Sequence, residues 1–140
     1  MIAVDTSIIV DLLGDGAMAD AAETCLRTAL TRGPVVACDV VVSEVVAGLG
    51  RGSQLLDALE EVGISYSPLE LRSAARAGEM QRRYNERARS AGRAQRSPRT
   101  VADFLIGAHA LLQCSALITR DAGFFRDYFK GLKVIVPKAG

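Results

Sequence analysis

Short runs of β-branched residues alternate with longer helical patterns along the whole chain, and this alternation limits the possible folds more than any other feature. It is typical of a parallel sheet whose strands are joined by helices. With 140 residues, 49% of them hydrophobic, the chain can bury one sizeable core but is too short for two ordinary domains. We therefore predict a single α/β domain over residues 1–140, with a central parallel sheet of about five strands flanked by helices.

The predicted strands are the short apolar runs at 2–5, 35–38, 64–66, 116–119 and 133–136. Helices are predicted between them at 7–13, 17–32, 41–49, 53–62, 68–91 and 101–113. Pro68 suits the first turn of the fifth helix, and the turn formers of 90–99 predict a loop. In the last helix, Thr100 is the expected cap and a buried face is expected to carry Val101, Leu105, Ala108 and Leu112.

The cysteines and the hydropathy pattern indicate where such a chain works. Cys25, Cys38 and Cys114 are odd in number and widely spaced, which fits neither a disulfide framework nor a zinc site. The chain begins without a basic segment, and no apolar run reaches the roughly 18 residues that span a bilayer. We therefore expect a cytoplasmic protein with no membrane partner.

Two aspartates stand at or just after the ends of predicted strands. Asp5 comes at the end of the first strand and before a helix, and Asp121 comes after the strand at 116–119 and before another helix. Each could simply cap the helix that follows, as aspartate often does. In open α/β folds, however, ligands gather at the carboxyl ends of parallel strands.

Two further acidic residues stand near helix starts. Glu44 interrupts the apolar run DVVVSEVVAG, where a carboxylate either points to solvent near the positive end of a helix or faces a site. Asp103 lies three residues after Thr100, so it could complete a capping box. The small residues that follow it predict tight packing around this helix.

Capping does not explain why acidic residues recur at these four places. Right-handed parallel connections would bring them to one edge of the sheet. Four neighbouring carboxylates cannot all stay ionised without a compensating charge, and oxygen ligands suit Mg²⁺ or Mn²⁺. Such an ion can activate water and stabilise charge on a phosphate, so hydrolysis of a phosphodiester is the chemistry we expect.

The sequence also resembles a known family. The segments AVDTSIIVDLL, SEVVAGL and ADFLIGAHALLQCSALITRDAGFF are similar, in order and spacing, to PIN domains and within them to VapC-type toxins of toxin-antitoxin pairs. The resemblance implies a PIN-like fold and a metal-dependent endoribonuclease that cleaves RNA with Mg²⁺ or Mn²⁺. It further implies a homodimer and a cognate antitoxin protein that blocks the cleft.

Carried over by residue, the resemblance places the acidic metal ligands and catalytic groups at Asp5, Glu44, Asp103 and Asp121. It also implies supporting roles for Thr6, which stands beside Asp5, and for Thr119, whose hydroxyl stands two positions before Asp121.

The segment 72–99 departs from any fixed family pattern. It holds nine of the seventeen basic residues, opposed there only by Glu79 and Glu86, although the formal net charge of the chain is +1. A basic surface near an acidic site would help to attract a polyanion, so we predict RNA contact through Arg89, Arg93 and Arg96. Contact with the antitoxin or a second subunit, or plain solvation, is the alternative.

Other readings have less support. His109 lies six positions after Asp103, on a different face of an ideal helix, so we expect a partly exposed and non-catalytic residue. Ser7 stands where a haloacid-dehalogenase-type phosphatase needs a second acid, and a receiver domain would need an acidic pair at the first strand. The alternative function is a catalytically silent PIN-like or receiver-like α/β binding module.

The aromatic residues at 124–129 are expected in the core or an interface.

Overall fold

The computed structural model describes residues 1–92 and 99–138. Within them the chain forms five strands and seven helices, in the order β1 (Ile2–Val4), α1 (Thr6–Leu13), α2 (Ala19–Leu30), β2 (Val35–Ala37), α3 (Asp39–Leu49), α4 (Gly52–Glu61), β3 (Ile64–Tyr66), α5 (Leu71–Ser90), α6 (Val101–Gln113), β4 (Ala116–Ile118), α7 (Ala122–Tyr128) and β5 (Val134–Ile135). The predicted α/β architecture is confirmed.

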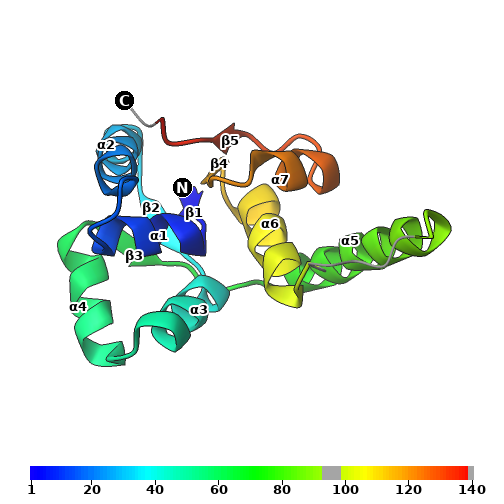
Figure 1. Cartoon of the computed structure of the whole chain (residues 1–140), viewed down its shortest axis with the longest axis horizontal. Coiled ribbons are helices and arrows are strands. Elements are labelled where there is room, and N and C mark those ends of the chain that lie inside the picture. Colours follow the sequence, from blue (N-terminus) through cyan, green and yellow to red (C-terminus); the bar gives the residue numbers. More distant parts are fainter. Residues whose placement is uncertain (93–98, 139–140) are drawn as a thin grey trace.

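The strands form one sheet in the order β3-β2-β1-β4-β5, and every neighbouring pair is parallel. β1 is central because its three apolar residues are buried on both faces, as expected of an inner parallel strand. Helix α6 packs against β1 and β4, whereas α2 packs against β2 (Figure 1). Since all strands run the same way, their carboxyl ends share one edge of the sheet.

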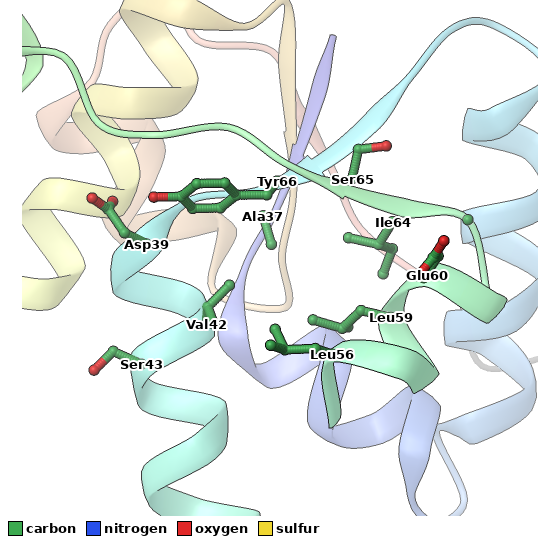
Figure 2. Close-up of a pocket in the computed structure, with 11 residues that line it drawn as sticks. Ala37, Asp39, Val42, Ser43, Leu56, Leu59, Glu60, Ile64, Ser65 and Tyr66 are labelled. Carbon is green, nitrogen blue, oxygen red and sulfur yellow. The ribbon is translucent and has the colours of Figure 1, made fainter. Parts of the chain in front are cut away.

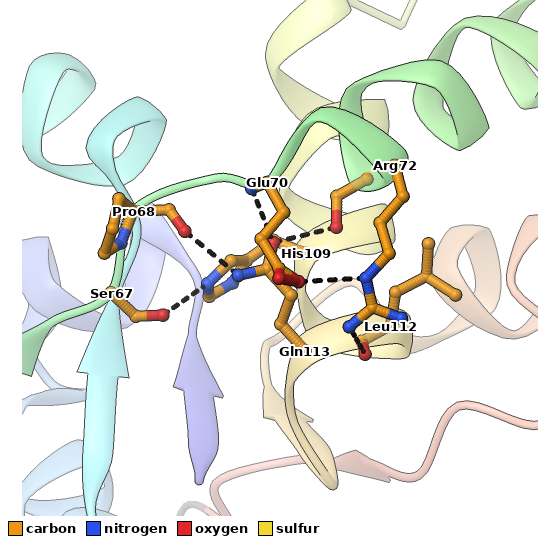
Figure 3. Close-up of polar contacts among 8 residues, drawn as sticks. Ser67, Pro68, Glu70, Arg72, His109, Leu112 and Gln113 are labelled. Carbon is orange, nitrogen blue, oxygen red and sulfur yellow. Dashed lines mark hydrogen bonds and ion pairs between the residues drawn. The ribbon is translucent and has the colours of Figure 1, made fainter.

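Helix α5 extends away from the sheet beside α6 (Figure 1). Its start is fixed by Gln113, whose side chain accepts hydrogen bonds from the Glu70 N–H at 2.9 Å and the Ser73 hydroxyl at 2.8 Å and donates one to the Pro68 carbonyl at 3.0 Å (Figure 3). The prediction that Pro68 lies in the first turn of this helix was wrong. Glu70 is the N-cap, and Pro68 belongs to the connection that Gln113 holds against α6.

The expected burial of α6 is confirmed, but the predicted buried face is only partly right. Ala108 is buried, Leu105 and Leu112 are half-buried, and Val101 is exposed. The helix contacts β1 and β4 as well as α3 and α5, so it is covered on more than one face. Val101 is exposed because it is the first residue of the helix, at the edge of these contacts.

The expectation that His109 is partly exposed was wrong. The side chain is 1% exposed, and Nε2 lies 3.0 Å from the Ser67 hydroxyl, the two forming a buried hydrogen bond (Figure 3). Burial lowers the pKa of His109, although the charges of Asp39 and Glu70 act in the opposite direction. A buried neutral imidazole with a hydroxyl partner is a structural element of the core.

The lowered pKa of His109 makes stability pH-dependent. Below a pH of about 6.5 the unfolded chain takes up a proton that the folded chain resists, so this stability is present above 6.5 and is lost as the pH falls. Replacing His109 by Gln keeps a polar partner for Ser67 but removes the titration. Urea unfolding near pH 7 and near pH 5 should show a larger loss of unfolding free energy for wild type than for His109→Gln. Equal losses in the two proteins would contradict this account.

The aromatic residues of α7 and of its C-cap, Phe129, form another part of the core. Phe124, Phe125 and Phe129 are buried, and Tyr128 is half-buried against Tyr84 of α5, with ring centroids 5.4 Å apart. This confirms their expected place in the core.

All three cysteines are free, as the sequence predicts, and burial raises the pKa of Cys114 to about 11. Among the described helices, none combines the length and the apolar character needed to cross a membrane.

Candidate functional site

The strand order reverses at β1, since the chain moves outward from β1 to β3 and then returns to place β4 on the other side of β1. In open parallel sheets, ligands bind outside the carboxyl ends of the strands at such a reversal. Asp5 follows β1 directly, and Thr119 and Asp121 follow β4. The topology therefore places these three residues at the position where a site is expected.

Hydrogen bonds join these strand ends. The Thr119 hydroxyl is fully buried, donates to Asp5 Oδ2 at 2.7 Å and accepts from the Asp121 N–H at 3.0 Å. The other oxygen of Asp5, Oδ1, accepts from the Thr6 N–H at 2.8 Å, so Asp5 does cap α1. Capping and a place in the site are thus compatible for Asp5, because each oxygen has a different partner.

Glu44 joins the same network through Thr6. The Thr6 hydroxyl donates to Glu44 Oε1 at 2.6 Å, which ties the start of α1 to α3. Glu44 is exposed, as one of the two sequence readings expected, and its carboxylate is held by the hydroxyl of Thr6, the residue next to Asp5. The charge of Glu44 contributes to the raised pKa of Asp5.

Asp103 caps its own helix from the first turn. Its Oδ2 accepts from the Thr100 N–H at 3.0 Å and from the Thr100 hydroxyl at 3.2 Å. Its charge also acts on the other residues of the site, since it raises the pKa of both Asp5 and Arg99. Asp103 therefore lies close enough to couple electrostatically with the network while one carboxylate oxygen serves the cap.

Arg99 is the residue of this site that the sequence did not single out. Its guanidinium forms an ion pair with Asp121 and lies 4.3 Å from the centroid of the Phe124 ring. The hydrogen bond to Asp121 raises the Arg99 pKa, and the charge of Asp103 adds to this rise. In the sequence Arg99 is one arginine among nine, and its position next to the Thr100 cap is the only available signal.

A second ion pair supports the loop that carries Asp121. Arg120 Nε lies 2.8 Å from Asp11 Oδ2, which joins α1 to the turn after β4. Asp11 is mostly buried, and Arg120 directly precedes Asp121. Residues far apart in sequence form this pair, so a local pattern did not reveal it.

Burial is the main cause of the raised pKa of Asp5, and the charges of Asp103 and Glu44 add to it. The hydrogen bonds from Thr119 and Thr6 oppose the rise because they favour the ionised form. Asp5 is therefore a desolvated carboxyl beside two other acids, a setting in which a cation would relieve an electrostatic cost.

Across residues 1–92 and 99–138, no three acidic, histidine or cysteine side chains converge into a ready coordination group. Hydrogen bonds link three of the predicted carboxylates, Asp5, Glu44 and Asp121, and Asp103 is coupled to them through its charge. The oxygens of the four acids accept from Thr6, Thr119, Thr100 and Arg99. This arrangement has a physical reason, since uncompensated carboxylates repel one another and turn to the donors within reach. The donor set itself consists only of oxygens, which suits Mg²⁺ or Mn²⁺.

A separate apolar cavity of about 590 Å³ lies between α3, α4 and β3 (Figure 2). Its walls include Val42, Leu56, Leu59, Ile64 and Tyr66, and none of the four predicted acids lines it. The cavity is therefore distinct from the acidic network.

Of the three arginines predicted to contact RNA, Arg89 is exposed near the end of α5. Arg93 and Arg96 lie outside the described residues.

Comparison with solved structures gives full-length matches. The VapBC2 structure from Rickettsia felis, bound to promoter DNA, has a TM-score of 0.70 at 17% identity and covers 99% of this chain and 100% of that one. FitAcB from Neisseria gonorrhoeae has a TM-score of 0.65 at 23% identity, covering 98% of each chain. VapC20 from Mycobacterium tuberculosis, a toxin that cleaves the sarcin-ricin loop, has a TM-score of 0.55 at 17% identity, covering 92% of this chain and 96% of that one.

At these identities the likeness establishes the shared fold. No curated protein matches the sequence. A family model does match, that of the PIN domain, over residues 2–130. Because that match spans nearly the whole chain and agrees with the observed fold, the protein belongs to the PIN domain family of nucleases.

Proposed function

We propose that the protein is an endoribonuclease that requires Mg²⁺ or Mn²⁺ and acts as the toxin of a toxin-antitoxin pair. The observation that carries this proposal lies at the reversal of strand order, where hydrogen bonds through Thr6 and Thr119 link Asp5, Glu44 and Asp121. The charge of Asp103 acts on Asp5 from the first turn of α6. A catalytically silent PIN-like binding module has no need to hold these carboxylates close together against their mutual repulsion. A receiver-like module would need an acidic pair at the first strand, which IAVDTS lacks.

In this proposal the four carboxylates would hold the metal. A bound divalent ion would supply an activated water and stabilise the charge on the phosphate. Thr119 orients Asp5 through its hydroxyl and fixes the backbone of Asp121, while Thr6 orients Glu44. Groups of this kind fix the direction of ligand oxygens and thereby tune a metal site.

The partners belong to the same proposal. The structures of VapBC2 and FitAcB are toxin-antitoxin assemblies, which supports a cognate antitoxin for this chain. A homodimer, a cytoplasmic location and RNA contact through Arg89, Arg93 and Arg96 complete it. The three free cysteines are consistent with a reducing compartment.

The test is cleavage of purified transfer and ribosomal RNAs with Mg²⁺, with Mn²⁺ and with chelator. We expect endonucleolytic products with either metal and none with chelator. Intact RNA under all three conditions would favour the silent binding module, and equal cleavage with chelator would reject the metal requirement.

A further inference from the structure

Two arginines are connected by a short row of aromatic rings that starts at the acidic network. The Arg99 guanidinium lies 4.3 Å from the Phe124 centroid, and the Phe124 and Tyr128 centroids are 5.4 Å apart. Beyond them the Arg87 guanidinium of α5 lies 5.3 Å from the Tyr128 centroid. Two guanidinium groups, each stacked on an aromatic ring of α7, therefore lie between Asp121 and α5.

The positive charge of Arg87 is available to a ligand. Arg87 is exposed and takes part in no ion pair within the described part of the chain. Arg83, one turn earlier on α5, is exposed as well. Glu86, the nearest acid on this stretch of helix, is paired with Arg82. The net charge of this part of α5 therefore stays positive.

Stacking also suits these side chains to phosphate. A guanidinium that lies over a ring keeps the N–H donors at its edge free, and the ring restricts its motion before a ligand arrives. Arg99 uses one nitrogen, Nη1, for Asp121 and retains other donors. Since the four carboxylates would repel a polyanion, fixed cations beside them would offset that repulsion.

We propose that Arg99 and Arg87 form a phosphate-binding track that holds the backbone of single-stranded RNA and leads it from the acidic network along α7 toward α5. The inference rests on the proposed function and adds the path of the substrate to it. Arg99 contacts the phosphate nearest the acidic network, and Arg87 contacts one further along the strand.

The test measures binding of a short fluorescein-labelled single-stranded RNA by fluorescence anisotropy, in chelator to prevent cleavage and over a series of KCl concentrations. Arg87→Gln should weaken binding on the order of tenfold at low salt, since one charge-assisted contact is lost. The slope of log affinity against log salt should become shallower by about 0.7, the value for one phosphate of a single strand. Arg99→Gln should behave similarly.

Two variants serve as controls, each checked for an unchanged melting temperature. Arg27→Gln removes an exposed arginine on α2, away from α5 and α7 (Figure 1), and should leave affinity and slope unchanged. Arg87→Lys keeps the charge but loses the planar fork, so its affinity should fall between wild type and Arg87→Gln.

Wild-type affinity and slope in Arg87→Gln would overturn the track and leave this surface for a protein partner. So would an equal loss in Arg27→Gln, because binding would then follow total charge. Failure of the proposed function looks different, since wild type would bind RNA with the predicted dependence on Arg87 but cleave none with Mn²⁺. If wild type bound no RNA in this assay, the track would be overturned, and cleavage with Mn²⁺ would decide the proposed function separately.

Discussion

Replacing Asp5 or Asp103 with asparagine is expected to remove most RNA cleavage while leaving the fold intact. The fold should survive because asparagine keeps one accepting oxygen. At Asp5 that oxygen can accept from the Thr6 N–H while the amide nitrogen donates to the Thr119 hydroxyl, and at Asp103 it can accept from the Thr100 backbone. Cleavage should fall because the negative charge that would bind the cation is lost. Groups that merely support metal ligands cost about 10- to 100-fold when removed, so we expect a loss on the order of 100-fold or more.

The measurement is the initial rate of cleavage at saturating Mn²⁺, with circular dichroism and melting curves to establish folding. Asp20→Asn is the matched control, because Asp20 is an exposed aspartate in the first turn of α2, outside the network. It should retain wild-type activity. Glu44→Gln and Asp121→Asn should also lose most activity. Near wild-type rates for Asp5→Asn or Asp103→Asn would show that the ligands are assigned wrongly.

Gly107→Ala is expected to destabilise the protein strongly. A Cβ on Gly107 would overlap the buried Phe129 ring and would lie 2.6 Å from its Cδ2 and Cζ atoms. The ring is packed against Phe125 and Phe124, so it cannot move away freely. Overpacking of this kind typically costs about 1–3 kcal/mol.

Gly78→Ala offers a matched substitution of opposite sign. Gly78 lies within α5, and beyond its chain neighbours and the backbone of its own helix no atom stands within 4 Å of the place where its Cβ would go. Alanine there should stabilise the protein by about 0.5–1 kcal/mol, because glycine is a poor helix former. Chemical unfolding of both variants measures the difference. A stability for Gly107→Ala equal to or above wild type would show that α6 and α7 are not packed as closely as described.

The sequence predicts the fold class because each strand and helix carries its own local pattern. All five strands fall within the predicted ranges. The order β3-β2-β1-β4-β5 was beyond such reasoning, since a run such as IAV does not specify its neighbours in the sheet. The wrong predictions for α6 also arose because a local pattern does not show which elements a helix packs against. A single apolar face was assumed for a helix that packs against both the sheet and two other helices, and this assumption also hid the burial of His109.

The candidate site likewise contains residues that the sequence indicated and one, Arg99, that only the fold revealed. Asp5 and Asp121 were predicted because they stand just after strands, and Glu44 and Asp103 because the sequence around them resembles PIN domains. The ion pair of Arg99 with Asp121 depends on a contact across 22 positions of the sequence, in a stretch without periodicity. Arg99 could therefore be identified only once the chain was folded.

The central claim is that the acidic residues form one shared cation site, and metal-induced stabilisation tests it without any substrate. Binding to the folded state alone stabilises by RT ln(1 + [L]/Kd), which is about 2.7 kcal/mol at a hundredfold excess over Kd. The measurement consists of four melting curves, for wild type and Asp103→Asn, each with Mn²⁺ and with chelator. We predict a clear rise in wild-type melting temperature with Mn²⁺ and a much smaller rise in Asp103→Asn. Equal rises in the two proteins, or no rise in wild type, would contradict a shared cation site that includes Asp103.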